Sequence, residues 1–143
     1  MNLIDQLKRD EGCRLKPYQD SLGIWTCGYG HNLEAHGWPT MPAEVTQEQA
    51  DQWLLQDVAS ASRQLDEHLP WAKSLDDPRH DVLVNMAFNM GIAGLLGFHR
   101  TLTMIEAGNY EGAADAMLES KWAKQVGDRA KRLSTQMRTG EYQ

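Results

Sequence analysis

The sequence predicts a mainly helical α+β fold, with a small β-containing lobe joined by a long helix to a helical lobe. Three observations lead to this prediction. Apolar residues recur with helical spacing over most of the 143 residues. Residues 13–33 instead mix aromatic and β-branched residues with glycine and proline, which is typical of short strands joined by turns. A long amphipathic stretch at 47–68 follows them. The chain has the length of a single domain.

The N-terminal part of the chain is predicted to form a short helix and then a hairpin. The helix covers residues 2–11, because Asn2 is a favourable N-cap and Gly12 ends the apolar periodicity. The run Asp-Ser-Leu-Gly at 20–23 is predicted to be the turn between two strands. Residues 34–45 contain two prolines and one glycine, so they are predicted to be a loop or an irregular edge.

The long helix is predicted from a capping box, Thr46 followed by Gln49, ahead of a continuous apolar stripe. At 1.5 Å per residue it would be roughly 30 Å long. Asp76 before Pro78 predicts the start of a central, largely apolar helix of the second lobe. Further helices are predicted around 98–105, 113–118 and 128–138. We therefore assign about 12–45 to the β-containing lobe, about 46–68 to the connecting helix, and about 1–11 with 69–143 to the helical lobe.

The composition argues against several classes of protein. A net charge of −6 is unlike that of a nucleic-acid binder. No apolar run reaches the roughly 18 residues that span a bilayer, and residues 1–20 lack the apolar core of a signal peptide. We therefore expect a chain that is cytoplasmic when made. Cys13 and Cys27 are too few for a disulfide scaffold or a four-cysteine zinc site, and are expected to be free thiols.

The charge is distributed unevenly along the chain. Residues 121–143 carry six basic and two acidic groups, which gives +4 there and −10 over the rest. Two interpretations remain open. The segment is either a solvated surface with one basic helix or a basic patch that meets an anionic polymer.

Residues 10–31 combine the groups that glycoside hydrolysis requires. Phosphate-loop, serine-hydrolase, zinc-protease and calcium-loop motifs are absent from the sequence. Glu11 is expected at a helix C-terminus, whose partial negative charge disfavours ionisation, whereas Asp20 lies in a polar turn. Two carboxyls in different environments can serve as acid and base. The residues alone leave open a catalytic pair or a surface acid with a turn-capping aspartate.

The pattern Glu11-x8-Asp20-x5-Thr26 resembles the catalytic motif of the phage lysozymes of the T-even type. Further matching motifs occur in the same order along almost the whole chain, at 56–58, 85–91, 97–98, 122, 128–132 and 138–140. The resemblance implies a lysozyme-like, two-lobed fold with a small antiparallel sheet. It also implies an endolysin that hydrolyses the β-1,4 bond between N-acetylmuramic acid and N-acetylglucosamine in peptidoglycan during host lysis.

In this resemblance Glu11 is the general acid, and Asp20 and Thr26 position and activate the attacking water. The family is usually described as inverting, which requires carboxyls roughly 6.5 to 9.5 Å apart so that the water fits. No cofactor and no metal ion take part in the reaction. We expect Glu11→Gln to abolish turnover and to preserve the fold.

The resemblance also assigns supporting and substrate-binding residues. Arg129 would pair with the catalytic glutamate, the alternative being an exposed cation on a basic helix. His31 and Asp57 would join the sheet to the long helix, which is a structural role. Phe88 and Thr101 would bind substrate, the alternatives being a core aromatic and a surface threonine.

Several positions depart from the family pattern or have less certain roles. Asn32 and Ala116 replace residues that contact substrate in the family, and the stretch from His31 to Thr46 is short. Trp25 and Trp38 are candidates for stacking on sugar rings. Cys13 and Cys27 occupy positions that are apolar in the family, so both are expected to be buried.

The implied partner is the peptidoglycan substrate alone, acted on by a monomer without nucleic acid or stable membrane association. A separate membrane-permeabilising protein would release the enzyme from the host cytoplasm to the wall. Two alternatives remain at this point. One is an inactive, lysozyme-like module that binds the cell wall or builds part of a phage particle, and the other is a chitinase-like activity on the same scaffold.

Overall fold

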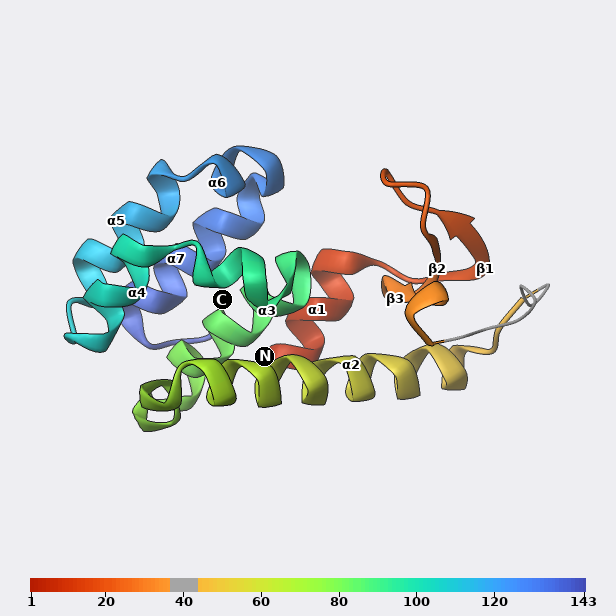
Figure 1. The fold of residues 1–143 in the computed structure, drawn as a ribbon, viewed down its shortest axis with the longest axis horizontal. Helices are drawn as coiled ribbons and strands as arrows, with labels where there is room; N and C mark the ends of the chain where they lie inside the picture. The colour runs from red at the N-terminus through yellow and green to blue at the C-terminus, as the bar shows by residue number, and fades with distance from the viewer. Residues whose placement is uncertain (37–43) are drawn as a thin grey trace. The chain divides into compact units, whose positions relative to one another are not determined.

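The computed structural model describes residues 1–36 and 44–143. Within them the chain forms seven α-helices, two 3₁₀ helices and a three-stranded antiparallel sheet (Figure 1). The elements are, in order, α1 (Leu3–Glu11), β1 (Arg14–Gln19), β2 (Trp25–Gly28), β3 (His31–Asn32), η1 (Glu34–His36), α2 (Gln47–His68), η2 (Pro70–Ser74), α3 (Asp77–Leu96), α4 (His99–Glu106), α5 (Tyr110–Glu119), α6 (Lys121–Val126) and α7 (Asp128–Thr139). The predicted mainly helical α+β class with a small antiparallel sheet is confirmed.

By its internal contacts the chain divides into two compact units. One comprises residues 4–59 and contains the sheet, and the other comprises residues 1–3 with 60–143 and is helical. The contacts group most of α1 with the sheet, whereas the sequence analysis assigned residues 1–11 to the helical lobe. The lobe boundaries given above stay a prediction.

The sheet has the strand order β1-β2-β3 and begins with the predicted hairpin. Tyr18 pairs with Thr26 across β1 and β2, and Thr26 pairs with Asn32 on β3. In the turn, the Gly23 amide donates to the Asp20 carbonyl at 2.9 Å, and Gly23 has a φ of 79°. Side chains from the sheet, the following segment and α2 form a small core behind it, namely Cys27, Leu33, Val45 and Trp53, with Leu15 and Trp25 packed against them.

Helix α2 begins where the capping box predicted. The Gln49 amide donates to the Thr46 hydroxyl oxygen at 3.0 Å, which satisfies one of the free amides of the first turn. Helix α2 has 22 residues, and its ribbon is unbroken in Figure 1. Most of the predicted apolar stripe is buried, at Ala50, Trp53, Leu54, Ala61 and Leu65. The remaining stripe residue, Val58, is only partly buried.

The helical unit is built around α3 and α7. Asp76 caps α3 by accepting from the Arg79 amide, and Gly91, with φ 80° and ψ 159°, interrupts the helix near its end. Helix α5 packs against α4 and α7, and α3 and α6 also contact α7. No single helix in the described part of the chain is long and apolar enough to cross a membrane, and α3 with α4 meets that criterion only as a pair bent by 103°.

The two cysteines are free thiols, as expected, but only one is buried. Cys27 lies in β2 with its Sγ 3.3 Å from the Leu15 carbonyl oxygen. Cys13 is exposed, so the expectation that it is a small buried residue is wrong. It lies between the end of α1 and the start of β1, outside the core that the sheet covers.

Candidate active site

Glu11 is the last residue of α1 and is partly buried. Its carboxylate lies near the turn between β2 and β3, because a Cβ atom added at Gly30 would be 3.6 Å from Glu11 Oε2. Gly30 has a φ of 80°, a conformation that a side chain would strain. Glycine is therefore favoured here by the backbone of the turn, which lies beside the Glu11 carboxylate.

Asp20 closes the β1–β2 hairpin through one carboxylate oxygen. Its Oδ1 accepts hydrogen bonds from the amides of Leu22, at 2.8 Å, and Ile24, at 3.0 Å. The turn-capping interpretation of Asp20 is therefore confirmed. It does not compete with a role in catalysis, because the turn occupies only one of the two oxygens.

Thr26 lies in β2 with only 5% of its surface exposed. Its hydroxyl donates to the carbonyl oxygen of Ile24 at 2.9 Å. A hydroxyl whose proton is already donated keeps its oxygen lone pairs for another donor. The local geometry thus makes Thr26 a hydrogen-bond acceptor toward any further group.

Tyr18 is a neighbour of both carboxyls that the sequence analysis did not assign. Burial raises the pKa of its phenol, the carboxylates of Glu11 and Asp20 raise it further, and the Arg14 guanidinium opposes them. That guanidinium lies over the Tyr18 ring, 4.1 Å from its centre. The available signal was its place in the sequence, near the end of the strand that leads from Glu11 into the turn at Asp20.

His31 and Asp57 form the pair that the resemblance implies. The Nδ1 atom of His31 lies 2.7 Å from Oδ2 of Asp57, joining β3 to α2. His31 is 2% exposed, and its ring stacks on Trp53 with 4.3 Å between centroids and 6° between planes. The pair is a structural support of the sheet.

Asn32 and Trp25, two positions noted in the sequence, have local structural partners. Asn32 Oδ1 accepts from the Ala35 amide at 2.9 Å and so caps η1. Trp25 packs on the small core, and its amide donates to the Glu34 carboxylate at 2.6 Å. Trp38 lies outside the described residues.

Arg129, on α7, is buried and not an exposed cation, so that alternative is wrong. Its Nε and Nη2 atoms donate to Asn85 Oδ1 at 3.0 and 2.8 Å. The two residues are 44 positions apart, and a buried guanidinium requires such partners. Its pairing with Glu11 stays a prediction.

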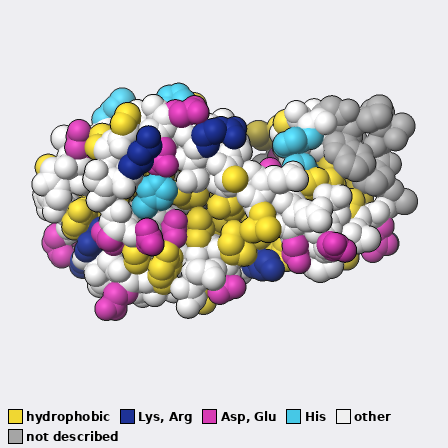
Figure 2. Space-filling model, turned by 90° about the horizontal axis from the view of Figure 1, so that it is seen from below, with side chains coloured by type: hydrophobic (Ala, Val, Ile, Leu, Met, Phe, Trp, Pro, Cys, Tyr) yellow, Lys and Arg dark blue, Asp and Glu magenta, His cyan; other side chains and the backbone are white. Residues whose placement is uncertain are grey.

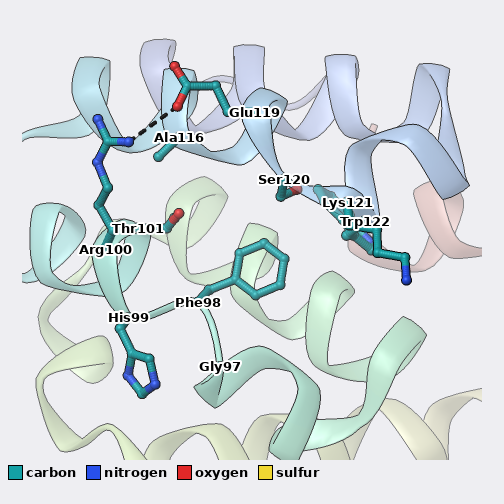
Figure 3. A pocket seen from close by; sticks show the side chains of 10 residues that line it. All are labelled: Gly97, Phe98, His99, Arg100, Thr101, Ala116, Glu119, Ser120, Lys121 and Trp122. Atoms are coloured by element: carbon teal, nitrogen blue, oxygen red, sulfur yellow. Dashed lines mark hydrogen bonds and ion pairs between the residues drawn. The ribbon is translucent and has the colours of Figure 1, made fainter.

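Thr101 is 4% exposed, so it is not a surface threonine. It lines a pocket of about 390 Å³ in the helical unit. Figure 3 shows its hydroxyl and the Phe98 ring directed into this space. The lining is Gly97, Phe98, His99, Arg100, Thr101, Ala116, Glu119, Ser120, Lys121 and Trp122. Arg100 and Glu119 form an ion pair at 3.2 Å beside the pocket, while Phe88 is partly buried on α3.

Three of the six basic residues of 121–143, Arg129, Lys131 and Arg138, contact polar or acidic groups of the chain itself. Arg138 contacts Glu111 at 3.0 Å and Asp115 at 2.9 Å, and Lys131 lies 3.7 Å from Asp128. On the face drawn in Figure 2, acidic and basic side chains are interspersed. The two interpretations of this segment, a solvated surface and a basic patch, both stay predictions.

Comparisons with known proteins relate this chain to phage lysozymes and endolysins. A family model described as phage lysozyme matches residues 8–139. The pre-baseplate central spike protein Gp5 of Enterobacteria phage T4 is 32% identical over 98% of this chain, which spans only 28% of that protein. The endolysin of Salmonella phage P22 is 35% identical over 82% of this chain and 79% of its own length. The probable T4-type lysozyme 1 of Dictyostelium discoideum is 27% identical over 97% of this chain and 95% of its own.

Proposed function

The chain belongs to the phage lysozyme family, and on that premise we propose that it is an endolysin, a muramidase that hydrolyses peptidoglycan. The bond cleaved is the β-1,4 linkage between N-acetylmuramic acid and N-acetylglucosamine. The enzyme acts as a monomer without a cofactor. It is made in the host cytoplasm and reaches the wall after a separate protein has permeabilised the membrane.

The hydrogen bonding of Asp20 and Thr26 carries this proposal. The Thr26 hydroxyl donates to the Ile24 carbonyl oxygen, so its own oxygen can accept a hydrogen bond from a water molecule. Asp20 uses Oδ1 for the turn, and its Oδ2 makes no hydrogen bond within the described part of the chain. A water that donates to both groups would direct an oxygen lone pair away from them. That lone pair is the nucleophile that hydrolysis requires.

The reaction then needs one proton donor and one proton acceptor. The water oxygen bonds to the anomeric carbon as the glycosidic C–O bond breaks, and Asp20 takes the proton that the water loses. Glu11 gives its proton to the leaving glycosidic oxygen. Attack from the face opposite to the leaving group inverts the anomeric carbon. Exchange of protons with solvent returns both carboxyls to their starting states.

Substrate binding is assigned to residues of the helical unit. Thr101 offers a hydroxyl in the pocket of Figure 3, where Ala116 contributes no polar group. The apolar surfaces of Phe98 and Trp122 suit the faces of sugar rings. Phe88 supplies a further contact from α3. Because alanine has no polar side-chain group, position 116 should make no side-chain hydrogen bond to the substrate, although the family residue there contacts it.

Product analysis on purified peptidoglycan tests this function. Mass spectrometry of the released fragments should find N-acetylmuramic acid at the new reducing ends, and NMR during early turnover should find the α-anomer first. N-acetylglucosamine at the reducing ends would contradict the assigned bond, and an initial β-anomer would contradict inversion. Comparable cleavage of chitin oligomers would instead favour a chitinase-like activity.

A second candidate function is favoured by the similarity to the phage T4 spike protein. Under this alternative, the chain is an inactive, lysozyme-like module that binds the cell wall or builds part of a phage particle. Cosedimentation with purified peptidoglycan, measured beside fragment release, separates the two functions. Binding without release would support the second candidate, whereas release by the wild-type chain and not by Glu11→Gln would support the muramidase.

A further inference from the structure

We propose that His31 and His36 bind a transition-metal ion such as Zn²⁺, with Asp57 as the carboxylate partner of His31. Each of the three residues has a metal-ligating atom within 4.8 Å of those of the other two. They come from three elements of the same unit, β3, η1 and α2. None of them is among the residues proposed above to cleave the glycosidic bond, so this metal site is distinct from the proposed catalytic residues.

His31 presents a ligand that is already held in place. Its Nδ1 contacts the Asp57 carboxylate at 2.7 Å, and its ring stacks on Trp53. The other ring nitrogen, Nε2, is buried and has no hydrogen-bond partner among the described residues. Buried polar atoms without a partner are rare in folded proteins, and each calls for a physical explanation. A metal ion bound to Nε2 would supply the missing partner.

His36 presents the same nitrogen on the exposed side of the cluster. Its Nδ1 lies 2.8 Å from the carbonyl oxygen of Asn32, and because a carbonyl only accepts, Nδ1 carries the proton. Nε2 therefore has a lone pair for a metal. Metal-bound histidines usually donate their other nitrogen to a carboxylate or a backbone carbonyl, and His31 and His36 show one of each. The two rings stack with centroids 4.3 Å apart.

The ligand chemistry selects the class of ion. Imidazole nitrogens favour Zn²⁺, Cu²⁺ and Ni²⁺, whereas Mg²⁺ and Ca²⁺ prefer oxygen ligands. Two nitrogens bound to one zinc ion at 2.0–2.1 Å cannot be more than about 4.2 Å apart. A metal ion lies in the plane of each imidazole that binds it, so the His36 ring must turn out of its stack on His31 for both Nε2 atoms to reach one ion. His36 is exposed and lies in a 3₁₀ helix of three residues, where its side chain has room to turn. Water would complete the coordination.

The test is a calorimetric titration with Zn²⁺ in a Cys13→Ser background, which removes the exposed thiol as a competing ligand. We expect saturable binding of one Zn²⁺ per chain, at least about tenfold weaker affinity in His36→Gln, and no competition by Mg²⁺. His68→Gln is the matched control. His68 is exposed and its Nδ1 contacts the carbonyl oxygen four residues earlier at 2.8 Å, as in His36, but it lies outside the cluster.

A spectroscopic measurement identifies the ligands. With Cu²⁺ as the probe, electron paramagnetic resonance should report two coupled imidazole nitrogens in the Cys13→Ser chain and one in His36→Gln. An unsaturable titration, equal Zn²⁺ affinity in His36→Gln, or a spectrum without imidazole coupling would each overturn the proposal. Neither measurement depends on hydrolysis, so failure of the metal-site proposal can be distinguished from failure of the proposed muramidase function.

Discussion

The Thr26 hydroxyl donates its proton to the carbonyl oxygen of Ile24, two residues earlier, across 2.9 Å. This contact fixes the direction of the hydroxyl, because a backbone carbonyl can only accept. Thr26 is 5% exposed, so few other groups can compete for the proton. The hydroxyl oxygen is thereby preset as a hydrogen-bond acceptor, which is the role that the proposed mechanism gives it.

Thr26→Val should lower kcat on peptidoglycan by about 100-fold, as expected when one positioned hydrogen-bonding group is removed from an active site. Valine has nearly the same shape, and the lost hydrogen bond to Ile24 should reduce the free energy of unfolding by about 1 kcal/mol. Thr26→Ser keeps the hydroxyl and should retain most of the activity. Turnover of Thr26→Val equal to that of the wild type would exclude a role for this hydroxyl.

Two substitutions at Asp20 should separate its structural role in the hairpin turn from its proposed role in catalysis. The amide oxygen of Asp20→Asn can accept from Leu22 and Ile24 as Oδ1 does, so the unfolding free energy should change by less than about 1 kcal/mol while hydrolysis is lost. Asp20→Ala removes both hydrogen bonds to a charged group and should cost about 2 kcal/mol as well as the activity. Urea denaturation and fragment release measure the two effects. An active Asp20→Asn variant would show that the carboxylate serves only the turn.

Glu11→Gln should abolish measurable turnover, since loss of a general acid costs on the order of 10²- to 10⁴-fold in rate. Circular dichroism and the thermal midpoint should match the wild type. Glu106→Gln is the control, because Glu106 is also the last residue of its helix, α4. If both variants lose equal activity, the effect comes from the helix terminus and not from acid catalysis at Glu11.

The stability of the helical unit should fall as pH rises through about 8, because of His80. The carboxylate of Asp81, and after it that of Asp66, raise the pKa of His80 to about 8 against the opposing effect of burial. Its Nε2 lies 2.8 Å from Asp66 Oδ1. Because the pKa of His80 is higher in the folded than in the unfolded protein, its ion pairs stabilise the fold fully at pH values below the unfolded pKa of about 6.5. This stabilisation is lost as the pH rises through the folded pKa.

Between pH 6 and pH 9 the free energy of unfolding should fall by about 2 kcal/mol. Urea denaturation at several pH values across that range measures this change. His80→Gln should flatten the profile in this window. Equal slopes for the two proteins would show that His80 does not carry the pH dependence.

The local elements were predictable from the residues because their signals are local. The Thr46 capping box placed the start of α2, and the Asp20–Gly23 turn placed the hairpin, since each depends on hydrogen bonds between residues at most four apart. Tyr18 and His36 were not predicted as parts of a site. Their importance comes from neighbours on other elements, such as the carboxylates around Tyr18 and the His31 ring beside His36.

By itself, the sequence predicted the fold class, the hairpin and most of the helices, but not α6. It also contained the motif that relates the chain to phage lysozymes. Only the tertiary structure decided which side chains are buried and what they contact. Arg129 and Thr101 are buried, Cys13 is exposed, and Asp20 divides its carboxylate between a turn and the remaining oxygen. The physical reason is that helical and strand periodicity depends on near neighbours. Burial and polar partners depend on contacts such as Arg129 with Asn85, which no local pattern records.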